Sequence, residues 1–60
     1  MRYTVYYGDE KTFNRPTLDE CIEFCYSLYR ECGIDYAYIK SHYTAVDFEM
    51  DNGYIRPLYD

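Results

Sequence analysis

The sequence predicts a single small α+β domain in which one helix packs on one face of a mainly antiparallel sheet. Between Pro16 and Gly33, apolar residues recur at three- and four-residue steps, which is the period of an amphipathic helix. On both sides of this segment, short alternating runs are bounded by Gly, Asn and Pro, a pattern typical of β-strands. The expected order over residues 1–60 is β-α-β-β, with a short additional strand at the end, in a sheet of three to four strands.

The first run, Arg2 to Tyr7, is rich in aromatic and β-branched residues and predicts the first strand. Its odd-numbered residues share one face and its even-numbered residues the other. The following segment, Gly8 to Arg15, contains turn formers and charges, and Phe13 is its single large apolar residue. We expect this segment to be a loop, with Phe13 under the start of the helix.

The helix has a start signal and a stop signal. Thr17 can cap the first turn, and Glu20 follows at the spacing of a capping box. Gly33 can adopt the left-handed conformation that ends a helix. The residues expected on the buried side of the helix are Leu18, Cys21, Ile22, Cys25, Leu28, Tyr29 and Cys32.

After the helix, the period changes to two in the runs Ile34 to Lys40 and Tyr43 to Met50, which predicts a β-hairpin with Ser41-His42 as a two-residue turn. In this register, an apolar face receives the helix. That face carries Ala37, Ile39, Thr44, Val46 and Phe48, and the other face carries Tyr36, Tyr38, Tyr43, Ala45, Asp47 and Glu49.

Asn52-Gly53 is a type I′ turn signal and predicts that the chain doubles back as a short last strand, Tyr54 to Arg56, before Pro57 ends it. Ile55 is then opposite Met50, and Arg56 is opposite Glu49. The sequence leaves the strand order open. The first strand is expected to be parallel if it pairs with the strand after the helix, through a crossover connection, and can be antiparallel if it pairs with the next one.

Eleven acidic against six basic residues give a net charge of −5, which disfavours nucleic acid and anionic membranes as partners and favours a basic protein surface. No apolar stretch has the length of a membrane span, and the N-terminus has no apolar segment of signal-peptide length. Three cysteines, an odd number on one helix face, favour a reducing, cytoplasmic location over a disulfide framework.

Cys21, Cys25, Cys32 and His42 form the only set with metal-ligand character, and a zinc site of three Cys and one His is conceivable. The interpretation that we favour is structural, because free cysteine is often buried and Cys-x₃-Cys is not the usual Cys-x₂-Cys pair. With all three thiols expected to point inward, no reactive Cys–His pair is expected. There is also no Gly-rich phosphate loop or serine triad, so we expect no enzyme activity, metal or cofactor.

The ten tyrosines are the most informative feature of the composition. A single helix leaves one sheet face uncovered, here called the open face. It is expected to carry the candidate partner-binding residues Tyr6, Tyr36, Tyr38, Tyr43, Asp47 and Glu49. Tyrosine is enriched at protein interfaces, although it also suits a solvated strand surface. Aromatic rings beside carboxylates favour Lys and Arg as contacts, through cation–π interaction and ion pairing.

We therefore hypothesise a small acidic protein-binding module that occludes a basic surface of a larger protein, such as a nucleic-acid-binding enzyme. As a class, it is similar to compact acidic inhibitors that phages and mobile elements encode, but no sequence motif carries that comparison. One alternative is an obligate homodimer with a structural or assembly role, since so short a chain buries only about 60% of its surface on folding. The other alternative is a compact domain that was designed or selected for folding rather than for a function.

Overall fold

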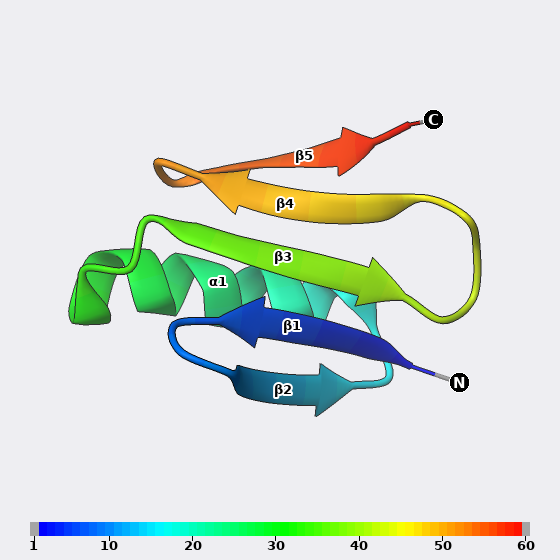
Figure 1. Cartoon of the computed structure of the whole chain (residues 1–60), viewed down its shortest axis with the longest axis horizontal. Coiled ribbons are helices and arrows are strands. Elements are labelled where there is room, and N and C mark those ends of the chain that lie inside the picture. The colour runs from blue at the N-terminus through cyan, green and yellow to red at the C-terminus, as the bar shows by residue number, and fades with distance from the viewer. Residues whose placement is uncertain (1, 60) are drawn as a thin grey trace.

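The structure is a computed structural model and describes residues 2–59. It confirms an α+β fold in which the helix α1 (Leu18–Cys32) lies against one face of an antiparallel sheet (Figure 1). The sheet has five strands in the spatial order β2-β1-β3-β4-β5. The strands are β1 (Tyr3–Tyr7), β2 (Lys11–Arg15), β3 (Tyr36–Ser41), β4 (Asp47–Asp51) and β5 (Tyr54–Leu58).

Strand β2 occupies most of the segment that was expected to be a loop, so that prediction is wrong. Lys11 to Arg15 pair with β1 in an antiparallel hairpin, and only residues 8–10 form the turn. β2 is an edge strand with polar residues on both faces, so its alternation is weak and its pairing with β1 determines its conformation. Phe13 does pack on the helix, stacked on Phe24 with ring centroids 3.7 Å apart.

The hairpin also determines how β1 pairs with the strand after the helix. Because β2 reverses the chain before α1 begins, β3 returns beside β1 in the antiparallel direction, with Val5 opposite Ile39. The expectation of a parallel pair at this position is therefore wrong. The crossover through α1 instead joins β2 and β3, and β1 lies between them.

Both ends of α1 agree with the sequence prediction. The Thr17 hydroxyl accepts a hydrogen bond from the Glu20 amide at 3.4 Å. Gly33 has a φ of 70°, and its amide and that of Ile34 donate to the Leu28 carbonyl. These caps satisfy backbone groups that have no partner within the helix, which explains why the helix begins and ends here.

The core lies between α1 and the sheet. Its fully or almost fully buried apolar residues are Val5, Cys21, Cys25, Leu28, Ala37, Ile39 and Met50. Burial raises the pKa of the Cys25 thiol to about 11 and also raises that of Cys21. The expectation that Cys32 points inward is wrong, because this residue is exposed at the end of α1, which extends past the ends of β1 and β3 (Figure 1).

The connection between β3 and β4 is longer than the predicted two-residue turn. β3 continues through Ser41, a loop covers residues 42–46, and Ile39 pairs with Phe48 instead of Thr44. The Ser41 hydroxyl accepts hydrogen bonds from the amides of Tyr43 and Thr44, which explains why the chain does not turn tightly here. Moving the partner of Ile39 from 44 to 48 is an even shift, so Phe48 and its neighbours in β4 keep the faces predicted for them.

The β4–β5 hairpin has the predicted turn and register. Asn52 and Gly53 have φ values of 52° and 85°, and Met50 pairs with Ile55. β5 extends past Pro57 to Leu58, two residues further than expected. An edge strand tolerates proline when the missing N–H faces away from the neighbouring strand.

Candidate protein-binding face

The open face is the side of the sheet opposite α1, and no other described element lies over it (Figure 1). Side chains alternate between the two faces along each strand. Tyr6, Tyr38 and the residues paired with them therefore point to the open face, whereas Val5 and the residues paired with it face the helix. Its strand residues are Thr4, Tyr6, Thr12, Asn14, Tyr36, Tyr38, Lys40, Asp47, Glu49, Asp51, Tyr54, Arg56 and Leu58.

Three tyrosines lie together on the inner strands β1 and β3 of the open face. Tyr6 and Tyr38 are cross-strand neighbours on β1 and β3, with ring centroids 6.5 Å apart. Tyr36 precedes Tyr38 by one pleat on the same side of β3. Tyr6 is 46% exposed and Tyr36 is 49% exposed, so about half of each side chain is available for contact. We call these three residues the tyrosine patch.

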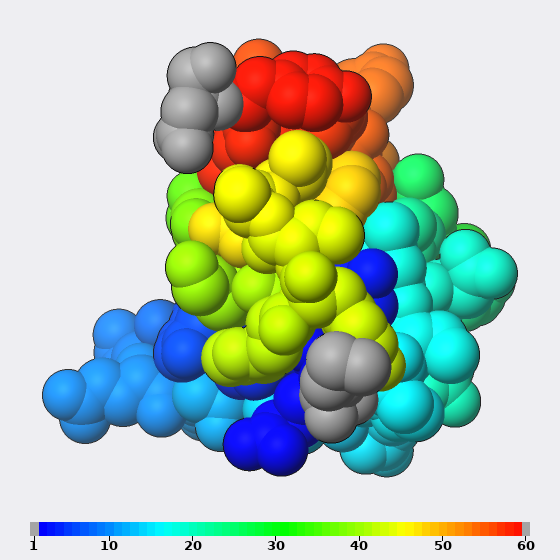
Figure 2. All heavy atoms as spheres, turned by 90° about the vertical axis from the view of Figure 1, so that its right-hand side faces the viewer, coloured from blue at the N-terminus to red at the C-terminus, as the bar shows by residue number. Residues whose placement is uncertain are grey.

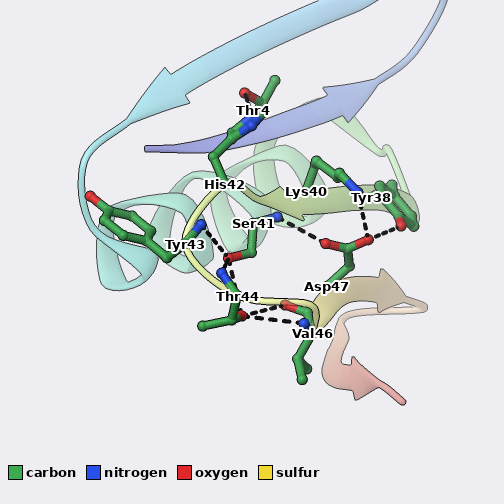
Figure 3. Close-up of polar contacts among 9 residues, drawn as sticks. All are labelled: Thr4, Tyr38, Lys40, Ser41, His42, Tyr43, Thr44, Val46 and Asp47. Carbon is green, nitrogen blue, oxygen red and sulfur yellow. Dashed lines mark hydrogen bonds and ion pairs between the residues drawn. The ribbon is translucent and has the colours of Figure 1, made fainter. Parts of the chain in front are cut away.

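Tyr43 does not belong to this patch, and its expected position on the open face is wrong. It lies in the loop of residues 42–46, and its hydroxyl donates to the Pro16 carbonyl at 2.8 Å. Its ring lies 5.0 Å from that of Tyr3, which packs against the core on the helix side. Figure 3 shows its side chain pointing away from Tyr38. Because the loop is longer than expected, Tyr43 is not part of the strand. Its hydrogen bond to Pro16 connects the loop to the segment just before α1.

Asp47 is held by three groups of its own chain (Figure 3). The Tyr38 hydroxyl and the Ser41 amide donate to its carboxylate, and the Lys40 ammonium lies 3.5 Å away. The hydrogen bond from Tyr38, followed by that from Ser41, lowers the pKa of Asp47. The carboxylate is therefore ionised at neutral pH and orients Tyr38. The sequence interpretation identified Asp47 but not its pairing with Lys40.

Glu49 is held in a similar way, by Arg56 and Tyr36. The Arg56 guanidinium approaches the Glu49 carboxylate to 2.6 Å, and the Tyr36 hydroxyl donates to its other oxygen at 3.1 Å. The hydrogen bond from Arg56 lowers the pKa of Glu49, even though desolvation opposes it. Desolvation and the bond to Glu49 raise the pKa of Tyr36. The predicted pairing of Arg56 with Glu49 is confirmed.

A hollow of about 250 Å³ lies between the tyrosine patch and the β1–β2 turn. In Figure 2 this turn, in lighter blue, projects from the molecule on the side away from α1. The residues that line the hollow are Tyr6, Tyr7, Gly8, Glu10, Lys11, Tyr36 and Tyr38. The sequence interpretation missed Glu10 and Lys11 because it treated the whole segment as a loop. No local signal identifies them, because β2 has polar residues on both faces and forms a strand only through its pairing with β1.

His42 lies at the other end of the open face, where its Nε2 atom is 3.0 Å from the Thr4 hydroxyl (Figure 3). Thr4 donates its hydrogen to Asn14 at 2.6 Å, so the His42 nitrogen is the donor to Thr4. Among residues 2–59, no three His, Cys, Asp or Glu side chains are grouped in a way that could hold a metal ion.

Comparisons with protein family models, with curated proteins and with solved structures give no match for this chain. Over residues 2–59, the structure contains no helix with the length and apolar character needed to cross a membrane.

Proposed function

We propose that this protein is a small protein-binding module whose open face covers a basic surface of a larger protein and thereby blocks it. The observation that carries the proposal is the tyrosine patch of Tyr6, Tyr36 and Tyr38, which lies on an uncovered sheet face beside a hollow, with Tyr6 and Tyr36 about half-exposed. Tyrosine provides a large, rigid and amphipathic contact area, which makes it common at protein interfaces.

Two hydroxyl groups of the patch support this proposal because they hold their rings in place. Tyr38 donates to Asp47, and Tyr36 donates to Glu49. Each carboxylate is in turn fixed by a cation of the same sheet. Side chains that are ordered before binding lose less conformational entropy when a partner docks, so the same contact area gives a higher affinity.

The charge of the chain favours a basic partner. The net charge is −5, and beyond the two ion pairs on the open face, Asp51 adds negative charge to β4 while Asp9 and Glu10 add it to the projecting turn. Such a surface accelerates association with a positively charged protein. A protein that normally binds nucleic acid presents a suitable surface, and an inhibitor of the kind encoded by phages is one form that this function takes. The free thiols support a reducing, cytoplasmic location.

The experiment is quantitative affinity capture from a candidate host lysate with the wild type, Tyr36→Ala and Tyr26→Ala, followed by titration of the captured protein. Tyr26 is the matched control because it lies on α1 and is 37% exposed. We expect a basic protein whose affinity falls about 30-fold with Tyr36→Ala, as for a central anchor residue, and is unchanged with Tyr26→Ala. Equal affinity for both variants contradicts the proposal.

The second candidate function is an obligate homodimer in which a second copy covers the open face. The same exposed tyrosine patch favours this candidate, because a symmetric dimer can bury it against itself. In that case Tyr36→Ala converts a dimer into a monomer and leaves the capture of every other protein unchanged.

A further inference from the structure

The geometry points to a specific role for the hollow between the tyrosine patch and the β1–β2 turn: it binds a single lysine or arginine side chain of the partner. This inference rests on the proposed function and identifies the anchor of that interface. The volume of about 250 Å³ lies below the roughly 300–1,000 Å³ of clefts that hold small-molecule ligands. It therefore suits one long side chain better than a free metabolite.

The walls of the hollow suit a cation. Tyr6 and Tyr36 contribute half-exposed rings, and Tyr38 adds a third. The faces of aromatic rings are electron-rich and attract ammonium and guanidinium groups. The hydroxyls of Tyr36 and Tyr38 donate to carboxylates, which increases the electron density of both rings. The same electron-rich ring faces would repel an anionic group such as a carboxylate or a phosphate.

The charges around the hollow also favour a cation. Glu10 lines it directly, and Asp51 acts electrostatically on Tyr36 at its edge. Lys11 is the cation in the lining; it is exposed, and its long stem runs beside Gly8. Glu49 contributes little net charge because it is paired with Arg56.

The backbone of Glu10 provides an independent observation. Its φ is 63°, in the left-handed region that glycine adopts without cost and glutamate does not. Strained residues of this kind cluster at functional sites, where the strain is retained for the sake of the side chain. Here the strained residue is one that lines the hollow, and its side chain carries a carboxylate. Glu10→Gly should therefore raise stability and weaken binding, whereas a residue with only a structural role would change stability and leave binding unchanged.

The test is an NMR titration of the protein with N-acetyl-arginine amide, with the neutral isostere N-acetyl-citrulline amide and with N-acetyl-glutamate amide. We expect saturable shifts of the Tyr6 and Tyr36 ring signals and of the Glu10 amide with the arginine probe alone, at a Kd on the order of 1 mM. The Tyr26 ring signal should not shift. Glu10→Gly should weaken binding of this probe about 3-fold or more while raising the melting temperature. Equal shifts with citrulline, larger shifts with glutamate or unchanged affinity in Glu10→Gly overturn the inference.

Failure of this inference can be distinguished from failure of the proposed function. If the arginine probe occupies the hollow but no basic protein is captured through Tyr36, the inference about the hollow stands and the occlusion function fails. If a basic protein is captured through Tyr36 but binds Glu10→Gly as tightly as the wild type, the function stands and the anchor role of the hollow fails.

Discussion

Replacement of Gly53 by alanine tests how α1 is joined to the β4–β5 hairpin. Gly53 has a φ of 85°, and a Cβ at this position would lie 2.9 Å from Cε2 and 3.1 Å from Cζ of the Tyr29 ring. The ring of Tyr29 must therefore move. Gly33 is the matched control, because its φ is 70° but a Cβ there would meet nothing within 4 Å.

The expected losses follow from these two environments. Alanine at a positive φ costs about 1–2 kcal/mol at either position. Displacement of the Tyr29 ring adds about 1 kcal/mol at Gly53, the low end for overpacking, since Tyr29 is 42% exposed and can turn outward. For a domain of this size, 1 kcal/mol changes the melting temperature by about 4–8 °C, so Gly53→Ala should melt about 4–8 °C below Gly33→Ala.

The assay is urea and thermal denaturation of Gly53→Ala, Gly33→Ala, Tyr29→Ala and the double variant of Gly53 and Tyr29. In the Tyr29→Ala background, the cost of Gly53→Ala should fall to that of Gly33→Ala, which gives a coupling energy of about 1 kcal/mol. Equal losses for both glycine variants, or strict additivity in the double variant, refute the contact between Tyr29 and the turn.

Three further predictions concern the core and the titrating groups, each measured by urea denaturation. Leu28→Ala should lower the free energy of unfolding by about 2–5 kcal/mol and Glu23→Ala by little, because Leu28 is buried and Glu23 is exposed; equal losses contradict this helix orientation. Since folding lowers the pKa of Asp47 from 3.8, its stabilisation is complete above this unfolded value and is lost as the pH falls through the lower pKa of the folded state, so stability should decrease in this acid range. Asp47→Asn should reduce this slope, and an unchanged slope contradicts the role of Asp47. Folding raises the pKa of Cys25 from 9.0 to about 11, so its contribution is complete below pH 9.0 and is lost as the pH rises towards 11. Cys25→Ala should weaken this alkaline loss, and the full loss in that variant contradicts the assignment.

The elements that could be predicted are those with local signals. Thr17 and Gly33 determine where α1 begins and ends, and Asn52-Gly53 determines the register of the last hairpin. β2 could not be predicted, because its polar residues form a strand only through pairing with β1. The β3–β4 loop depends on the Ser41 hydroxyl, which competes with a tight turn in a way that residue spacing does not reveal.

The same distinction applies to the candidate site. The alternation of side chains along each strand predicted that Tyr6, Tyr36, Tyr38, Asp47 and Glu49 share one face. The pairing of β3 with β4 differs from the expected register by an even number of residues, so all five stay on that face. Tyr43 was misplaced because its position depended on the turn itself. The hollow was not predictable either, since it arises from how the β1–β2 turn projects beside the tyrosines, which is a property of the assembled sheet.

The most direct test of the central claim, that the open face is free to bind another protein, is the solution mass by light scattering from micromolar to near-millimolar concentration. The account predicts a monomer throughout, with a mass of 7.3 kDa for the wild type, and a monomer for Tyr36→Ala as well. A wild-type mass of twice that value, reduced to the monomer by Tyr36→Ala and retained in Tyr26→Ala, would contradict the claim, because the open face would then be occupied by a second copy of the chain.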